Sequence, residues 1–165
     1  MYQIKMKIIG NGQMPVKKTK GAAAYDCYAR IDNYRRKLIL KAGARGVKVP
    51  LGFAVELPQG YRMEIYMRSG TALKTGLRIS NGAGIIDSDY RGEVNILLDR
   101  LETKERGVDF DTIEDGDRIA QAIIVKDPEY EVIQVDELSE TERGNGGFGS
   151  TGVNDTVESE AEAAK

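Results

Sequence analysis

The chain has 165 residues and a net charge of −2, a length that favours one domain with a substantial hydrophobic core. Its 4 prolines exclude a proline-rich or collagen-like protein, and no apolar run approaches the roughly 20 residues of a membrane-spanning helix. Histidine is absent, which removes the usual general base, the usual metal ligand and any histidine-activated nucleophile. An enzyme with this composition must therefore use carboxylates, arginines and hydroxyls, together with any metal that its substrate brings.

The charge is unevenly distributed along the chain. Residues 154–165 carry −3, so the preceding residues sum to +1. A nearly neutral body lacks the basic face that nucleic acids require, and direct nucleic-acid binding is not expected. The acidic tail lacks aromatic residues and is predicted to be disordered. The single Cys27 permits no internal disulfide, and residues 2–7 lack the apolar block of a signal peptide, which together fit a cytoplasmic protein.

Short alternating stretches separated by turn residues predict many strands. Residues 2–9 and 61–67 each place apolar side chains on one face and mostly polar side chains on the other. Further strands are predicted at Lys37–Leu40, Val47–Val49, Phe53–Leu57, Glu93–Leu98, Arg118–Val125 and Glu131–Val135. Strands at this spacing favour an all-β fold, an antiparallel barrel or jelly roll.

One short helix interrupts the predicted strands. It covers Ser69 to Lys74, with Ser69 as the N-cap and Gly76 as the C-terminal stop. Residues 99–115 are rich in charge and are predicted to form a long hairpin excursion between strands. Neither an internal repeat nor a second domain is apparent in the sequence.

The first two segments with polar side chains suited to binding or catalysis lie in the first half of the chain. Asp26 is predicted to lie in a turn, where it either holds a water or metal-bound water or satisfies the turn backbone. Arg68 and Ser69 lie at the start of the short helix, where unpaired N–H groups attract anions. A capped helix with a solvated arginine explains the second segment equally well.

The next two segments lie in the second half of the chain. Asn81 to Gly92 resembles a β-hairpin whose two arms can clasp a planar ligand, with the amide of Asn81 as donor and acceptor. An ordinary acidic hairpin tip is the alternative. In the fourth segment, Asp117 and Arg118 are predicted to pair with each other or with a neighbouring subunit, and Gln121 can face a phosphate.

The fifth segment is the glycine-rich stretch from Arg143 to Gly152. Glycines let the backbone close tightly on a ligand, and an arginine offers a fork of donors for phosphate oxygens. Phe148 adds a flat face for a base. A flexible linker would explain the glycines but not Arg143 and Phe148, so the segment predicts a flap that folds over a nucleoside phosphate.

Taken in order, the five segments resemble the motifs of the trimeric dUTPase family and span residues 23–152. The matching blocks are Ala24-Tyr25-Asp26, Arg68-Ser69-Gly70, Gly84 to Gly92, Gly116 to Gln121 and Arg143 to Gly152. The chain departs from the family at Met67, where proline is usual, and at Ala24, where glycine is usual. Neither departure replaces a chemical group.

The resemblance implies a distorted jelly-roll subunit of the β-clip type, assembled as a homotrimer with active sites shared between subunits. It implies a jelly-roll domain over residues 1–142, a closing arm over 143–153 and a tail over 154–165. The implied reaction converts dUTP and water to dUMP and pyrophosphate, with Mg²⁺ carried by the triphosphate, in the cytoplasm or in host cytoplasm for a viral protein. Such an enzyme limits uracil incorporation into DNA and supplies dUMP for dTMP synthesis.

The resemblance also implies a role for each matching residue. Asp87 activates the attacking water, Tyr90 packs under the deoxyribose and thereby excludes UTP, and Asp26 contacts water on the Mg²⁺. Uracil is read by Asn81, Gly84, Ile85, Ile86 and Asn95. The phosphates are held by Arg68, Ser69, Gly70 and Gln121. From the arm, Arg143 with Gly149, Ser150 and Thr151 grips the γ-phosphate, and Phe148 covers the uracil.

Three other functions remain open at this point. A dCTP deaminase, or a bifunctional relative, shares the fold, although the aspartate and tyrosine of the third segment favour the hydrolase. A regulatory protein would use the 99–115 excursion or the tail to engage another protein. A structural jelly roll without a ligand is the third alternative.

Overall fold

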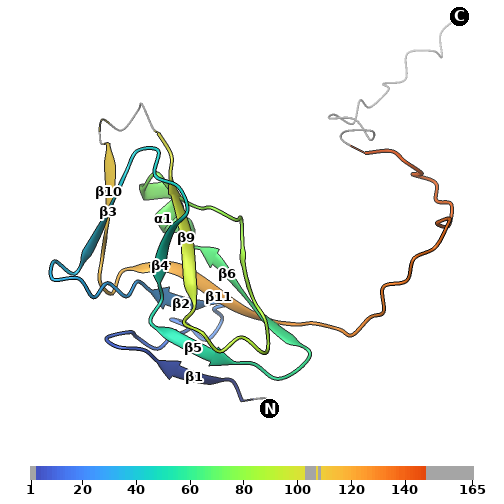
Figure 1. Cartoon of the computed structure of the whole chain (residues 1–165), viewed down its shortest axis with the longest axis horizontal. Coiled ribbons are helices and arrows are strands. Elements are labelled where there is room, and N and C mark those ends of the chain that lie inside the picture. Colours follow the sequence, from blue (N-terminus) through green and yellow to red (C-terminus); the bar gives the residue numbers. More distant parts are fainter. Residues whose placement is uncertain (1–2, 103–106, 108, 148–165) are drawn as a thin grey trace, which may run out of the picture. The chain divides into compact units, whose positions relative to one another are not determined.

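The computed structural model describes residues 3–102, 107 and 109–147, and these form an all-β fold with one short helix (Figure 1). Every paired strand is antiparallel, which confirms the predicted fold class. The elements are β1 (Lys5–Ile8), β2 (Tyr25–Tyr28), β3 (Lys37–Lys41), β4 (Val47–Pro50), β5 (Phe53–Glu56), β6 (Tyr61–Met67), α1 (Ser69–Lys74), β7 (Leu77–Ile79), β8 (Gly84–Ile86), β9 (Asn95–Arg100), β10 (Phe110–Glu114) and β11 (Arg118–Lys126).

The strands form four sheets of a distorted jelly roll. The largest has the order β2-β11-β6-β8, and a three-stranded sheet has the order β4-β9-β7. Two further pairs, β1-β5 and β3-β10, lie at opposite ends of this body in Figure 1. Because non-consecutive strands are neighbours, segments far apart in the sequence meet on one sheet, and this arrangement brings the candidate site residues together.

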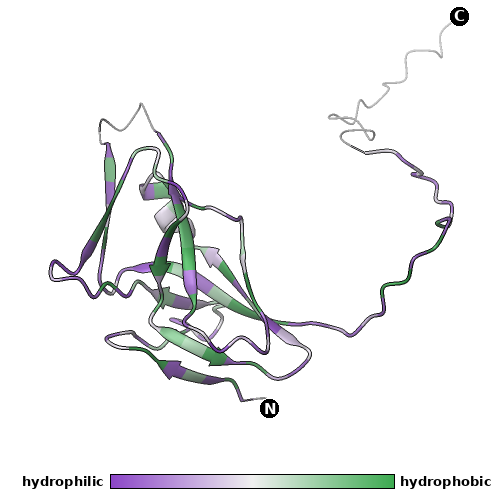
Figure 2. Cartoon of the chain, in the orientation of Figure 1, coloured by the Kyte–Doolittle hydropathy of each residue, from purple (hydrophilic) through white to green (hydrophobic). Residues whose placement is uncertain are grey.

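Buried residues of most strands form one hydrophobic core, and hydrophobic and hydrophilic residues alternate along several strands (Figure 2). On β6, Met63 and Ile65 are fully buried in this core. Glu64 points to the opposite face and is also buried, but its carboxylate accepts hydrogen bonds from Tyr66 and Arg62. The Tyr66 hydroxyl and then the Arg62 guanidinium hold the pKa of Glu64 below its usual value, so the carboxylate stays charged in its buried position.

The charged stretch 99–115 contains a strand, contrary to the predicted excursion. β9 continues to Arg100, and β10 pairs with β3 in a register that places Asp111 opposite Leu40. Ile113 is the one buried side chain of β10. The sequence of this strand therefore shows almost no alternation of apolar and polar residues by which it could be predicted. The connection between β9 and β10 therefore shortens to residues 101–109, of which 103–106 and 108 lie outside the described residues.

The short helix begins one residue away from its predicted cap. Ser69 is the first helical residue, and Arg68 occupies the N-cap position without a side-chain capping bond. At the other end the N–H of Thr75 donates to the carbonyl of Thr71, and Gly76 lies just beyond. The predicted helix is confirmed, whereas the role of Ser69 as its cap is wrong.

The chain divides into two compact units, one ending at Glu129 and the other beginning at Tyr130. The predicted strand at 131–135 lies in the second unit and is wrong, because a strand needs a ladder partner and these residues pair with no strand in the described part of the chain. Its apolar side chains Val132 and Ile133 are 86% and 67% exposed. The described part of the chain contains no helix long and apolar enough to cross a membrane.

Candidate active site

The four-stranded sheet brings three of the sequence segments into one cluster. Asp26 lies on β2 opposite Gln121 of β11, and Gln121 lies opposite Tyr66 of β6. Asp26 is therefore part of a strand rather than of the predicted turn. Arg68 follows directly after β6, so its side chain reaches the same cluster.

Two guanidinium groups surround the carboxylate of Asp26. Arg68 Nε lies 2.9 Å from Asp26 Oδ1, and Arg118 Nη1 lies 2.9 Å from Oδ2. This pairing corrects the first predicted alternative, in which Asp117 and Arg118 pair with each other, since the Asp117 carboxylate instead accepts the backbone N–H of Glu114. With two arginines to one carboxylate, the cluster carries a net positive charge, and each guanidinium retains N–H donors for a phosphate oxygen.

An open pocket of about 470 Å³ adjoins this positive cluster at the N-terminal turn of α1. Arg68, Gly70 and Arg118 contribute to its lining, together with Thr71 and Lys74. Ser69 is exposed beside them, where the first N–H groups of a helix have no intrahelical acceptor. Arginines, a lysine and unpaired N–H groups make this surface suitable for phosphate groups.

The loop from Asn81 to Gly92 is not the predicted hydrogen-bonded hairpin. Its first arm, β8, pairs with β6, whereas β9 pairs with β4 and β7. Because the two arms bond to different sheets, they diverge and leave a pocket of about 280 Å³. Its lining residues are Ile85, Ile86, Asp87, Tyr90, Glu93, Asn95 and Leu97.

The walls of this second pocket suit a nucleoside. Ile85, Tyr90 and Leu97 are exposed, so they offer an uncovered apolar surface on which a flat base can lie. The side-chain amide of Asn95 lies among them and can both donate and accept. The combination of apolar walls with a few directed polar groups is typical of a small-molecule site.

Tyr90 is held in place by its own loop. Its backbone N–H donates to the carbonyl of Asp87 at 3.2 Å, and its hydroxyl donates to the carbonyl of Glu93 at 3.0 Å. The ring crosses Gly92, where an added Cβ would lie 2.3 Å from the tyrosine oxygen. Glycine at position 92 is therefore required for this placement of the ring.

Asp87 directly follows β8 at the edge of the same pocket and is exposed. Within the described ranges its carboxylate forms no hydrogen bond or ion pair with another residue. The pocket has two carboxylates, Asp87 and Glu93. Glu93 is paired with Arg30, so Asp87 is the one that is free to bind a water molecule. Asn81 and Gly84 lie outside the pocket lining, and Gly84 instead packs closely on Ile65.

The glycine-rich arm is described only in part. Arg143 forms a local turn in which its Nε donates to the carbonyl of Gly146 at 2.9 Å. Phe148, Gly149, Ser150 and Thr151 lie outside the described residues.

The prediction from the sequence did not assign three residues of the candidate site. Arg118 was not recognised as a partner of Asp26, and Glu93 and Leu97 were not assigned to the pocket. The last two share a face of the chain with Asn95, because side chains alternate along an extended strand. This period-two spacing was the available signal, whereas the pairing of Arg118 depends on strand order.

The chemistry of the acidic residues limits how a metal can bind. In the described ranges, no group of three or more acidic or cysteine side chains is arranged to hold a metal ion. Asp26 is a single carboxylate next to arginines, which suits contact with the water shell of a phosphate-bound cation better than direct coordination by the protein alone.

The sequence is similar to known proteins over most of its length. A sequence model of the dUTPase family matches residues 10–152. The deoxyuridine 5'-triphosphate nucleotidohydrolase of Caulobacter vibrioides is 47% identical over 146 residues, which cover 87% of this chain and 90% of that protein. The protein of the same name from Treponema denticola is 46% identical over 140 residues, covering 85% and 91%.

Solved structures show the same similarity. A mutant dUTPase of Staphylococcus bacteriophage 80alpha with dUpNHpp superposes with a TM-score of 0.81 at 27% identity, covering 93% of this chain and 100% of that one. A dUTPase of phage phi11 of S. aureus, described with a structural Mg(II) ion, gives a TM-score of 0.72 at 23% identity, covering 84% and 100%. The second similarity concerns the fold alone.

Proposed function

The chain belongs to the dUTPase family, whose members are deoxyuridine 5'-triphosphate nucleotidohydrolases, and on this premise we propose that it cleaves dUTP to dUMP and pyrophosphate through a water held by Asp87. The observation that carries this assignment is the free carboxylate of Asp87 at the edge of a pocket with apolar walls, a tyrosine and an amide. An aspartate carboxylate is ionised at neutral pH in water, so it can orient a water molecule and accept its proton. No histidine is available for that task.

The proposed chemical step is a single displacement at the α-phosphorus. The water oxygen forms a bond to the α-phosphorus while its proton passes to Asp87, and the bond to the bridging oxygen of the β-phosphate breaks. Pyrophosphate leaves with the electron pair of that bond. Positioning and stabilisation of charge supply most of the acceleration in such reactions.

The nucleoside half of the substrate occupies the pocket between β8 and β9. Asn95 and the backbone of Ile85 and Ile86 read the uracil edge, with Asn81 and Gly84 supporting the loop. Tyr90 lies under the sugar, where its fixed ring leaves no room for a 2′-hydroxyl. Exclusion by contact with this ring accounts for the selection of dUTP over UTP.

The triphosphate half is bound by the positive cluster at the start of α1. Arg68, Ser69, Gly70 and Gln121 contact phosphate oxygens, and Arg118 joins them because it shares Asp26 with Arg68. Asp26 would contact the water shell of a Mg²⁺ ion carried by the triphosphate. The ion would neutralise phosphate charge when bound.

The two halves of the site support assembly into a homotrimer. The pocket at Asp87 contains none of the phosphate-side residues, and the pocket at Arg68 contains none of the nucleoside-side residues. We propose that a complete site combines parts of different copies. Exposed apolar side chains between Tyr130 and Leu138 provide the surface for such an exchange, because they lie uncovered in the single chain.

The glycine-rich arm completes the proposed site. Residues 143–153 close over the substrate, with Arg143, Gly149, Ser150 and Thr151 at the γ-phosphate and Phe148 on the uracil. Closure excludes bulk water and orders the reacting groups. The jelly-roll domain over 1–142 carries the rest of the site, and the tail over 154–165 has no assigned part in it. In the cytoplasm this activity would limit uracil in DNA and provide dUMP for dTMP synthesis.

The decisive experiment measures pyrophosphate release from dUTP, UTP, dCTP and dTTP, with the wild type and the variant Asp87→Asn. We expect turnover with dUTP alone, and we expect the variant to bind dUTP but to lose about 100-fold or more in kcat, because its amide cannot accept the water proton. Asp89→Asn is the matched control, since Asp89 is a neighbouring exposed carboxylate that does not line the pocket.

Two outcomes would contradict the proposal. Near-normal turnover by Asp87→Asn would show that another group activates the water. Ammonia released from dCTP, with no pyrophosphate from dUTP, would identify a deaminase instead.

A further inference from the structure

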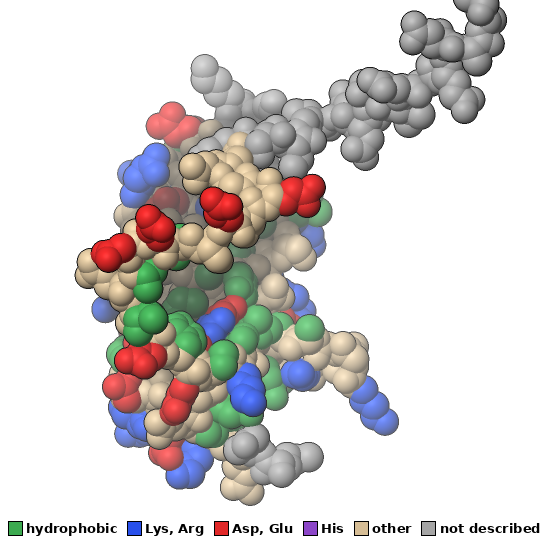
Figure 3. All heavy atoms as spheres, turned by 90° about the vertical axis from the view of Figure 1, so that its right-hand side faces the viewer, with side chains coloured by type: hydrophobic (Ala, Val, Ile, Leu, Met, Phe, Trp, Pro, Cys, Tyr) green, Lys and Arg blue, Asp and Glu red, His purple; other side chains and the backbone are tan. Residues whose placement is uncertain are grey.

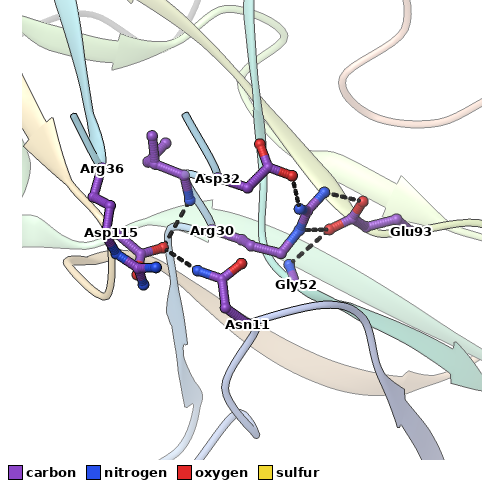
Figure 4. Close-up of polar contacts among 8 residues, drawn as sticks. Asn11, Arg30, Asp32, Arg36, Gly52, Glu93 and Asp115 are labelled. Atoms are coloured by element: carbon purple, nitrogen blue, oxygen red, sulfur yellow. Dashed lines mark hydrogen bonds and ion pairs between the residues drawn. The ribbon is translucent and has the colours of Figure 1, made fainter. Parts of the chain in front are cut away.

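An ion pair behind the nucleoside pocket connects the pocket to the body of the fold (Figure 4). Arg30, just beyond β2, binds both oxygens of Glu93, with Nε 2.7 Å from Oε1 and Nη2 2.9 Å from Oε2. The remaining arm of the guanidinium donates to Asp32 at 2.5 Å. The side chains of Arg30 and Glu93 are only 13% and 19% exposed, so little solvent screens the pair.

The backbone carbonyl of Glu93 holds two of the polar side chains of the pocket. Its carbonyl accepts the hydroxyl of Tyr90 at 3.0 Å and the side-chain amide of Asn95 at 2.6 Å. Glu93 thus has two functions: its carboxylate is fixed by Arg30, and its carbonyl fixes the residues proposed to contact sugar and base. A shift of this one residue would move Tyr90 and Asn95 together.

Arg30 is itself fixed by the turn that joins β4 to β5. Its backbone N–H donates to the carbonyl of Pro50 at 2.8 Å, and an added Cβ on Gly52 would lie 3.3 Å from the Cβ of Arg30. The N–H of Gly52 donates to Glu93 Oε1 at 3.1 Å, so the carboxylate has a third donor. The ion pair between Arg30 and Glu93 is therefore held from several sides. Its planar, bidentate geometry cannot be reproduced by the single ammonium group of a lysine.

We propose that Arg30 is a positioning residue for nucleoside selection, acting through the carboxylate of Glu93 to fix Tyr90 and Asn95. This inference rests on the proposed function, because it assigns the sugar and the base to that pocket. Arg30 touches neither substrate nor the reacting atoms. Its effect is on how well the pocket distinguishes a deoxyribose from a ribose.

The test compares Arg30→Met, Arg30→Lys and Glu93→Gln with the wild type. We expect Arg30→Met to raise KM for dUTP and to reduce the preference for dUTP over UTP in kcat/KM by about tenfold or more, with a smaller change in kcat. Arg30→Lys should restore part of the preference through one charged contact. Glu93→Gln keeps an oxygen acceptor and removes the charge, so it should fall between the two.

Arg36→Met is the matched control for loss of an ion pair in the same region. Arg36 pairs with Asp115, which also accepts the side chain of Asn11 and the N–H of Ile31, but it does not contact Glu93 (Figure 4). Thermal unfolding of each variant measures the structural cost separately. A purely structural role for Arg30 predicts the same nucleotide preference in all variants, and that result would overturn the inference.

The test of Arg30 as a positioning residue can be separated from the test of dUTP hydrolysis. Titration calorimetry with the α,β-imido analogues of dUTP and UTP measures the preference without turnover. If the wild type binds the dUTP analogue but does not hydrolyse dUTP, the proposed reaction fails, and Arg30 is judged from the two affinities alone. If Arg30→Met does not fold, Arg30→Lys and Glu93→Gln must still lower the preference, or the inference is refuted.

Discussion

At the scale of single residues, Cys27 shows how burial determines reactivity. The side chain lies on β2 in the core, and its S–H points toward the carbonyl of Tyr25 at 3.6 Å. Burial, followed by the negative charge of neighbouring Asp26, raises the pKa of the thiol from 9.0 to about 12. The thiol therefore stays protonated and unreactive in the folded protein.

We expect no reaction of native Cys27 with a disulfide reagent such as DTNB at pH 8, and one equivalent after unfolding in guanidinium chloride. The folded state also retains a proton that the unfolded thiol loses, so Cys27 contributes to stability below the unfolded pKa of 9.0, and this contribution declines as the pH rises toward about 12. Denaturant unfolding between pH 8 and pH 11 measures the decline. Rapid modification of the native protein would mean that β2 opens readily.

Individual residues also show the limit of reading the sequence. The roles of Asp87, Tyr90 and Asn95 were expected from the resemblance to the dUTPase motifs, and the structure places all three around one pocket. The pairing of Asp26 with Arg118 was not predicted, because it depends on β11 lying next to β2. Side-chain identity indicates which chemistry is available, whereas strand order determines which groups meet.

At the scale of elements, two loops press against each other where only glycine fits. Gly12 follows β1, Gly52 lies between β4 and β5, and a Cβ on Gly12 would lie 2.1 Å from the carbonyl oxygen of Gly52. Gly52 also has φ of +73°, a conformation that favours glycine. Because Gly52 contacts Glu93 as well, this junction supports the second arm of the nucleoside pocket.

Gly12→Ala should therefore destabilise the fold by roughly 1–3 kcal/mol, because the added methyl group meets backbone that must move. Gly21→Ala is the matched control, since no atom lies within 4 Å of the position of its Cβ. Urea unfolding of both variants measures the difference. Equal stability of the two would show that the loops separate without cost.

Elements were predicted well where one face is apolar and poorly where it is not. β6 and β11 combine buried apolar residues with a polar face, and both were anticipated. β10 buries a single residue, so its sequence lacks the apolar pattern from which a strand is predicted. At 131–135 the opposite error arose, because an apolar sequence of strand type pairs with no strand among the described residues.

At the scale of the whole molecule, side chains of both charges share one face. One face shows Lys and Arg interspersed with Asp and Glu, with hydrophobic side chains exposed among them (Figure 3). In the second unit the large exposed side chains include Tyr130, Val132 and Leu138. Such residues are costly in water, so we propose that they pack against other copies of the chain.

Shortened chains test the proposed assembly and the arm together. A chain ending at Glu142 should still sediment at three times its own, smaller monomer mass, yet lose at least about tenfold in activity, because the closing arm is missing. A chain ending at residue 153 is the control and should keep both properties. Full activity without residues 143–165 would exclude the arm from the site, and a monomeric full-length chain would exclude the shared site.

The buried thiol on β2 has a practical consequence for watching this arm. Since Cys27 is the sole cysteine of the sequence and is shielded by the core, a thiol introduced elsewhere would be the single attachment point for a dye. Asn145→Cys would carry a fluorophore on the exposed part of the arm without removal of the native cysteine. Nucleotide-induced closure could then be followed in real time on an otherwise unaltered polypeptide.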